Sequence, residues 1–345
     1  MNLRVAFTYM ILALCLMSCA PVQWDMRVSK NADLVWPPPP NPAKAQYLGE
    51  ITSFVPTGKS LATVIFGKST KDGRIMKPVS LAVASDGRIA IADLQAIGVH
   101  LYIPGSQSYR LINRTSKHKL ISPVSVAFDD NLTLFVSDSN LRKVFMYDPK
   151  GDYIGEITGP GGAKKFSRPT GLVYVAQNDS LYVVDTLANE IDVFDHTGKF
   201  KFNFGRRGIG DGEFNMPTHI AANASHLLVN DAMNFRAQTF AQTGRFLDKF
   251  GHHGDGSGDF AMAKGVAIDR WGVVYVAETL FDVVQLFDMS GEYLMSIGGK
   301  GTAPGQFWMP SGLFIDRYNK LYVCDTYNKR VQLFQLLHIG TGGGQ

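Results

Sequence analysis

A repeat of 45 to 48 residues occupies most of the 345-residue chain and restricts its fold more than any other feature. Residues 310–334 show the pattern, which is three short runs rich in β-branched and aromatic residues, separated by polar turn residues. Six copies begin at Pro78, Pro123, Pro169, Pro217, Ala263 and Pro310. A period in the forties with several strands per unit is typical of a β-propeller, in which neighbouring blades bury one another's apolar faces. We therefore predict a single all-β domain.

Two positions align the copies with one another. An acidic residue closes the second strand of each copy, at Asp93, Asp138, Asp185, Asp231, Glu278 and Asp325. An aromatic residue ends the third strand nine residues later, at Tyr102, Tyr147, Phe194, Phe240, Phe287 and Phe334. The acids could form a ring of catalytic or metal-binding carboxylates, or each could bond backbone amides at its strand end. Their presence in every copy favours the turn role, because one active site does not need six copies.

The later copies resemble a known repeat. They contain Pro-x-Gly-Leu, then Leu-Tyr-Val-x-Asp-Thr-x-Asn, a third strand ending in Phe, and Phe-Gly-x-x-Gly. This pattern resembles the NHL repeat over residues 47–334, although the first two copies lack the full Phe-Gly-x-x-Gly stretch. The resemblance implies a six-bladed β-propeller of four-stranded blades. It does not imply one function, since that fold serves binding modules and some enzymes.

The chain length after the last copy predicts how the ring closes. In a middle copy a fourth strand follows the aromatic residue, as at residues 199–204, but only a short segment and a flexible Gly-rich tail (340–345) follow Phe334. Residues 47–51 read as a lone strand near the other end of the chain. We predict that this strand completes the last blade, closes a propeller of residues 46–339 and removes an open sheet edge.

The N-terminus reads as an export signal over residues 1–18, with an apolar run too short for a comfortable membrane span. The signal ends in Leu-Met-Ser followed by Cys19, which resembles the bacterial lipobox; the alternative is an ordinary secretory signal with a chance cysteine. The resemblance implies cleavage before Cys19 and lipidation of that residue. Residues 19–45 would then be a lipidated, Pro-rich tether, in which residues 36–42 should adopt the polyproline II conformation.

Lipidation would place the mature chain in a bacterial cell envelope, held to the membrane by its N-terminal lipid. Ala20 follows the cysteine, and in the enteric sorting pattern this favours the outer membrane, facing the periplasm or the exterior. Cys324 remains as the one other thiol of the mature chain, so we expect it to be a small buried hydrophobe in a monomer.

Basic residues are concentrated in the loops that lead into the first strands, and these loops share one face of a propeller. Lys164, Lys165, Arg206 and Arg207 are our candidate ligand-binding residues on that face. The alternative is solvated loop charge that keeps the chain soluble. Some NHL propellers bind RNA on such a face, but the net charge of +4 is too mild to demand nucleic acid, and export argues against it. A protein or another anionic ligand of the envelope fits better.

His219 and Lys264 follow repeat starts, so we expect them at one mouth of the central channel, where a polar ligand or ordinary water would bind. In the related amidating-lyase propellers, histidines from several blades hold zinc, whereas here one histidine stands at the corresponding repeat position. Lactonase-type propellers hold calcium with Glu, Asn and Asp, and the repeats show no such series. Gly-x-Ser-x-Gly, P-loop and Cys-x-x-Cys motifs are absent. We predict no catalytic residue, metal or cofactor.

The expected function is a lipid-anchored binding or scaffold protein that presents one propeller face to a protein or an anionic ligand. The alternative is a propeller enzyme of the lyase or lactonase type, with a metal in the central channel. A purely structural spacer remains a third possibility, and it predicts no saturable partner.

Overall fold

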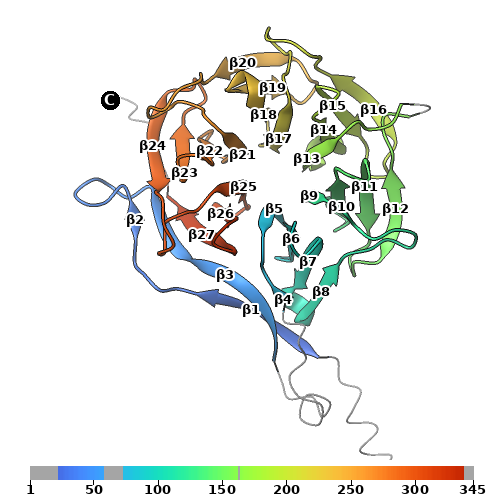
Figure 1. Cartoon of the computed structure of the whole chain (residues 1–345), viewed down its shortest axis with the longest axis horizontal. Helices are drawn as coiled ribbons and strands as arrows, with labels where there is room; N and C mark the ends of the chain where they lie inside the picture. The colour runs from blue at the N-terminus through green and yellow to red at the C-terminus, as the bar shows by residue number, and fades with distance from the viewer. Residues whose placement is uncertain (1–21, 58–72, 162–163, 338–345) are drawn as a thin grey trace, which may run out of the picture.

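The computed structural model describes residues 22–57, 73–161 and 164–337. Six sheets surround a central axis, and five of them are four-stranded antiparallel meanders (Figure 1). The first strand of each blade is innermost and packs against the first strands of both neighbouring blades. The prediction of an all-β propeller with six blades is confirmed.

The first two blades contain β5 (Pro78–Val83), β6 (Ile89–Asp93), β7 (Gly98–Ile103) and β8 (Ser108–Ile112), then β9 (Pro123–Phe128), β10 (Leu134–Asp138), β11 (Lys143–Tyr147) and β12 (Tyr153–Ile157). The third and fourth contain β13 (Pro169–Val175), β14 (Ser180–Asp185), β15 (Glu190–Phe194) and β16 (Phe200–Phe204), then β17 (Pro217–Ala222), β18 (His226–Asp231), β19 (Arg236–Ala241) and β20 (Phe246–Phe250). The fifth contains β21 (Ala263–Ile268), β22 (Val274–Glu278), β23 (Val283–Phe287) and β24 (Tyr293–Gly298). Three 3-10 turns are η1 (Pro104–Ser106), η2 (Ala176–Asn178) and η3 (Ala232–Asn234).

The sixth blade joins the two ends of the chain. Its inner strands are β25 (Pro310–Ile315), β26 (Lys320–Asp325) and β27 (Arg330–Leu336), and its fourth strand is β3 (Ala45–Thr57). β3 pairs antiparallel with β27 from Val331 opposite Ile51 to Leu336 opposite Ala45. The predicted closure of the ring by an N-terminal strand is therefore confirmed.

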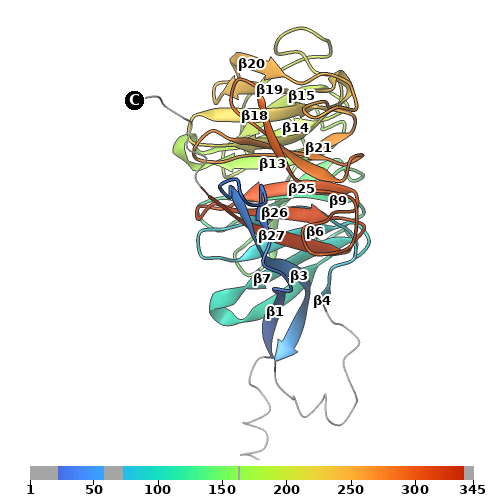
Figure 2. The same cartoon turned by 90° about the vertical axis from the view of Figure 1, so that its left-hand side faces the viewer.

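The residues that precede β3 pair with the edge of β3 that faces away from β27. We had expected these residues to form an extended tether instead. β1 (Gln23–Ser29) pairs antiparallel with β3, and β2 (Val35–Trp36) pairs with its beginning. The continuation of β3 also pairs with β4 (Gly73–Arg74). Figures 1 and 2 show β1 and β3 along the outer rim of the sixth blade and toward the first. The sequence did not indicate this edge because these strands do not share the repeat.

Cys19 and the predicted signal lie outside the described residues. Among the residues that the structure does describe, no helix has the length and apolar character needed to cross a membrane.

Aromatic residues anchor the connections between blades. The phenylalanines of four connections, Phe166, Phe214, Phe260 and Phe307, are at most 1% exposed. Each packs on the third-strand aromatic of the blade that follows, as Phe214 does on Phe240, with ring centroids 5.5 Å apart. Such pairs contribute about 0.5–1.5 kcal/mol beyond area burial. The connections are therefore fixed to the blades rather than held by their backbone alone.

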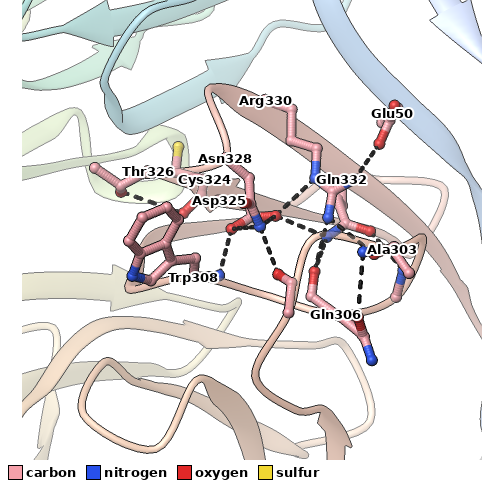
Figure 3. A network of polar contacts seen from close by, with 12 residues as sticks. Glu50, Ala303, Gln306, Trp308, Cys324, Asp325, Thr326, Asn328, Arg330 and Gln332 are labelled. Carbon is pink, nitrogen blue, oxygen red and sulfur yellow. Dashed lines mark hydrogen bonds and ion pairs between the residues drawn. The ribbon is translucent and has the colours of Figure 1, made fainter.

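The acids that close the second strands are buried and bond backbone amides. Asp93 accepts hydrogen bonds from the amides of Met76 and Lys77, which come just before the repeat start at Pro78. It also accepts hydrogen bonds from the amides of Gln95 and Ala96, which follow Asp93 in the turn. The equivalent acid of each of the other five blades also accepts a hydrogen bond from an amide just before the repeat start. Figure 3 shows the polar contacts around one of these acids, Asp325. The prediction that these acids have a turn role is confirmed.

Candidate ligand-binding face

Two sets of segments form one face of the propeller. They are the connections that lead into the first strands and the turns between second and third strands. Backbone hydrogen bonds join them, for example from Thr279 N to Met262 O (3.2 Å) and from Tyr327 N to Trp308 O (3.1 Å). We call this surface the start face, because every first strand begins there. The turn acids and the anchored phenylalanines hold its loops in place.

The four predicted basic residues are exposed on the start face, but two of them face acids of the same face. The Lys164 ammonium contacts the carboxylate of Glu190. Burial would lower the pKa of Lys164, but the hydrogen bond and charge of Glu190 raise it overall. Arg206 lies 2.8 Å from Glu213.

Lys165 and Arg207 complete the predicted basic set. Within the described part of the chain, neither has a carboxylate within salt-bridge distance. Only two of the four predicted basic residues therefore carry a positive charge that no acid of the described residues pairs with.

The start face also carries large apolar side chains that our sequence interpretation missed. Among the described residues, fifteen large apolar side chains are exposed, and nine of them lie on this face. We call these nine residues, which come from all six blades, the apolar ring: Ile97, Ile121, Leu187, Ile209, Met233, Met262, Leu280, Trp308 and Tyr327. Of the other six, two lie in segments of the opposite face: Tyr318, in the loop between β25 and β26, and Leu337, directly after β27.

A sequence signal for the apolar ring exists. Leu187, Met233, Leu280 and Tyr327 each stand two residues after the acid that closes the second strand. Four apolar residues at one exposed turn position is a pattern that turn formation does not require.

The second residues of four first strands lie at the start-face end of these innermost strands, and none of them lines the cavity of the central channel. Two of these residues use their hydroxyls within the fold, since Thr170 pairs with Thr186 and Ser311 with Thr326, both at 2.7 Å. Thr218 accepts a hydrogen bond from the Asn230 amide at 3.0 Å. Lys264 differs from them, because it makes no ion pair or hydrogen bond within the described part of the chain.

His219 is the third residue of its first strand and lines the start-face end of the channel cavity, which extends from there to loop residues of the opposite face. The channel cavity has a volume of about 270 Å³ and is walled by all six first strands. The His219 Nδ1 atom lies 3.2 Å from the Thr218 hydroxyl. Burial, with a contribution from the charge of Lys264, lowers the pKa of His219 to about 4, so the imidazole is neutral at pH 7.

Lys264 is half-buried beside two other nitrogen groups. Burial and the charge of Lys77 lower the pKa of Lys264. Lys77 in turn lies over the ring of Tyr327, 5.3 Å from its centroid. The structure thus brings the predicted pair His219 and Lys264 together with Lys77, which we had not selected, and with one aromatic member of the apolar ring.

One group of acids in the described residues has ligand atoms close enough for a metal ion. Asp185, Glu190 and Asp192 place one oxygen each within 4.8 Å of one another. They belong to β14 and β15 of the third blade and do not line the channel. Asp192 is buried, and neither of its oxygens has a hydrogen-bond partner. Burial, with the charge of Glu190, raises the pKa of Asp192 to about 7.

Comparison with protein families shows the same repeat. A family model, DUF5128, described as a 6-bladed beta-propeller, matches residues 170–234. The protein "brain tumor" of Drosophila melanogaster is 33% identical over 92 residues, which are 26% of this chain. The chain spans 8% of the length of that protein.

Solved structures share the fold at low sequence identity. A virginiamycin B lyase from Staphylococcus aureus, with quinupristin, superposes with a TM-score of 0.55 at 13% identity, covering 76% of this chain and 96% of that one. The gluconolactonase XC5397 of Xanthomonas campestris gives 0.56 at 15%, covering 90% and 100%. A protein of unknown function from Bacteroides thetaiotaomicron gives 0.58 at 12%, covering 92% and 90%. At these identities the likeness concerns the fold alone, and the chain is a six-bladed β-propeller with NHL-like repeats.

Proposed function

We propose that this protein is a lipid-anchored binding platform of the bacterial cell envelope and that its start face captures a protein partner. The observation that carries the proposal is the unequal distribution of exposed apolar side chains among the described residues, with nine on the start face and two, Tyr318 and Leu337, in segments of the opposite face. Single exposed apolar residues are ordinary, but their concentration on one face marks an interaction site.

The composition of the apolar ring supports a protein partner. Trp308 and Tyr327 pack together with ring centroids 5.6 Å apart and are each more than two-fifths exposed. Aromatic residues and methionine are enriched at the cores of protein interfaces, whereas charged residues are found at the rim. Lys165 and Arg207 supply such a rim, which would favour an acidic partner and speed its association.

The rigidity of the start face also supports binding. Its loops are held by buried turn acids and by phenylalanines packed into the blades, so few loop conformations need to be lost on association. Preorganised surfaces bind more tightly for the same contact area because ordering costs are already met.

A pair of leucines in the fifth blade provides the test. Leu280 lies in the start-face turn, and Leu294 lies on the outermost strand β24, at 55% and 39% exposure. The full chain is produced in its host with a photo-cross-linking residue in place of Leu280 or of Leu294. We expect a discrete adduct from position 280 only, and its loss when Met233→Asp is added. Equal adducts from both positions, or an adduct indifferent to Met233→Asp, would overturn the proposal.

Lipid anchoring through Cys19 has a separate test. The full chain and its Cys19→Ser variant are labelled with an alkyne fatty acid in a bacterial host, and the membranes are fractionated. We expect labelled native protein in the outer-membrane fraction and an unlabelled variant. Label on the variant would exclude Cys19 as the lipidated residue.

The alternative of a lyase or lactonase requires a metal in the central channel. The acids of the described residues that could share a metal ion lie in the third blade instead. Metal analysis of the purified full chain tests this alternative, since a channel enzyme would hold stoichiometric zinc or calcium that survives the change Asp192→Gln.

A further inference from the structure

The turns between the first and second strands of the fifth and sixth blades share a sequence that the other blades lack. Both contain an Asp-Arg-aromatic triplet, at residues 269–271 and at residues 316–318. The acid of each triplet has a turn role, because it accepts hydrogen bonds from backbone amides of its own turn. Turn formation requires neither the arginine nor the aromatic residue, so these two positions are free to serve another purpose.

A groove on the face opposite the start face lies beside both triplets. It has a volume of about 510 Å³ and is lined mainly by turns between the first and second strands of the fourth, fifth and sixth blades, which are neighbours in Figure 1. Its polar lining includes Asn223, Ser225, His226, Arg270 and Arg317. A concave site of this size with a few polar groups is typical of small-ligand binding.

The two arginines of the groove stack on the aromatic residues of their own triplets. The guanidinium of Arg270 lies over the Trp271 ring and that of Arg317 over the Tyr318 ring, each 4.7 Å from the ring centroid. Asn319 of the sixth blade, which is 3% exposed, also holds Arg270. In the amide orientation that satisfies both polar atoms of Asn319, its oxygen accepts hydrogen bonds from Nε and Nη2 of Arg270, both at 2.9 Å. The Nη1–Nη2 edge of this guanidinium has no partner within the described part of the chain.

The acids beside the groove do not pair with these cations. Among the described residues, neither Arg270 nor Arg317 has a carboxylate within salt-bridge distance. Asp269 and Asp316 line the groove, but each is bonded to amides of its turn and to one tyrosine hydroxyl. The other titratable group of the lining, His226, carries no negative charge. Both guanidiniums therefore remain available to an anionic ligand.

The wall that the fourth blade supplies is polar. The side-chain oxygen of Asn223 accepts hydrogen bonds from the amides of Ser225 and His226. The amide nitrogen of Asn223, the Ser225 hydroxyl and the His226 imidazole have no hydrogen-bond partner within the described part of the chain. Such groups can donate to and accept from the hydroxyls of a ligand.

These features together match one class of ligand. The free edge of Arg270 has two parallel N–H donors, which fit the two oxygens of a planar carboxylate. The polar wall fits hydroxyls, and the rings of Trp271 and Tyr318 offer apolar surface to C–H groups. A neutral sugar would leave the arginines unused, and a simple carboxylate would leave the polar wall unused.

We propose that this groove binds a sugar acid, with its carboxylate on Arg270 and its hydroxyls toward Asn223, Ser225 and His226. Arg317 supplies a second positive charge beside the bound anion. The site goes beyond the proposed function, because it lies on the face opposite the start face and takes a small ligand rather than a protein.

The test follows the Trp271 side chain by fluorine NMR. The purified full chain is labelled with fluorotryptophan in detergent, and the Trp271 resonance is identified by its absence from the Trp271→Phe variant. The probes are glucuronate, glucose, acetate and glucose-6-phosphate. We expect glucuronate to shift this resonance and to bind at least about tenfold more tightly than glucose or acetate, as one charged hydrogen bond predicts.

Matched variants separate the groove from the rest of the surface. Arg270→Gln should reduce the affinity for glucuronate to that for glucose. Arg270→Lys keeps the charge without the planar edge and should retain only part of the preference. Arg207→Gln, on the start face, should leave binding unchanged, and thermal unfolding of each variant confirms that the fold is retained.

Three results would overturn the inference. Equal binding of glucuronate and glucose, or equal effects of Arg270→Gln and Arg207→Gln, would show that Arg270 does not hold the carboxylate. Acetate that binds as tightly as glucuronate would show that the polar wall contributes nothing. Tighter binding of glucose-6-phosphate than of glucuronate would assign the groove to a phosphate instead of a carboxylate.

Discussion

The guanidinium of Arg330 lies 2.6 Å from the carboxylate of Glu50, and this ion pair joins β27 to the N-terminal strand β3 across 280 positions of sequence. The same guanidinium bonds the buried Asp325 at 2.7 Å and the carbonyl oxygens of Ala303 and Gln306 at 2.9 Å (Figure 3). One side chain thus connects the strand that closes the ring, the turn acid of the last blade and the loop before it. Closure of this propeller depends on this side chain as well as on strand pairing.

Arg330→Ala should therefore destabilise the protein far more than Glu50→Gln. The first change leaves Asp325 buried without its cation, which costs about 3–5 kcal/mol, whereas Gln retains an oxygen that can accept from Arg330 and should cost about 1 kcal/mol. Urea unfolding followed by fluorescence measures both free energies. Losses of similar size would show that Asp325 does not need the guanidinium.

Trp36→Ala should release the segment before β3 from the sixth blade. The Trp36 ring packs edge-on against Phe334 at 5.5 Å, and a Cβ added to Gly305 would lie 2.6 Å from it. Loss of about 2 kcal/mol of local packing would speed trypsin cleavage after Lys30 and Lys44 by about tenfold or more, since cleavage follows local opening. Mass spectrometry of timed digests identifies the sites.

The control for that digest is Trp308→Ala, which removes an exposed tryptophan of the start face. Cleavage of residues 23–45 should be unaffected by it. If native protein and both variants are cut equally fast, these residues behave as the free tether that the sequence suggested.

The sequence could predict the repeat and the closure of the ring because both follow from periodic patterns of strands and turns. It could not predict β1 and β2, since their partner is the outer edge of β3 and they lack the repeat. The basic residues could be identified from the sequence of the loops. Their ion pairs could not be predicted, because Lys164 reaches Glu190 and Arg206 reaches Glu213 only after the loops fold back on the blades.

The apolar ring was also difficult to predict from the sequence. An apolar residue in an isolated turn suggests burial, and only its repetition in Leu187, Met233 and Leu280 at one turn position indicates a surface. The contact between Lys77 and Tyr327 could not be predicted from the sequence either, because it forms only where the first and last blades meet.

Gly265→Ala should be poorly tolerated because two first strands approach closely at this position. A Cβ on Gly265 would overlap the backbone oxygen of Ser311 and lie 2.8 Å from the amide nitrogen of Leu313. Backbone cannot move aside as a side chain can, so we expect a loss of about 3 kcal/mol in the free energy of unfolding. Gly105→Ala, whose Cβ would meet nothing within 4 Å, is the control in the same denaturation experiment. Equal stability of the two variants would contradict the close approach of β21 and β25.

Asp192 should make stability fall as pH rises. In the next three blades its position is held by Gln238, Gln285 and Gln332, whose amides bond the preceding loop, whereas the buried Asp192 carboxylate has no such bond. The pKa of Asp192 is raised from 3.8 to about 7, so the native state holds this proton after the unfolded chain has released it. Unfolding is therefore increasingly favoured between about pH 4 and pH 7, and the penalty is complete above pH 7.

Asp192→Gln removes this penalty and restores the residue of the later blades. We expect the variant to match native stability near pH 4 and to exceed it at pH 8 by a few kcal/mol, at about 1.4 kcal/mol for each unit of pKa shift. Urea unfolding at pH 4, 6 and 8 measures the difference, with Asp248→Asn as the control at an exposed carboxylate on β20. A difference that is constant with pH would mean that Asp192 is ionised in the folded protein, with Lys164 or a bound cation as its partner. Calcium or manganese that stabilises the native chain and leaves the Gln variant unchanged would identify the cation.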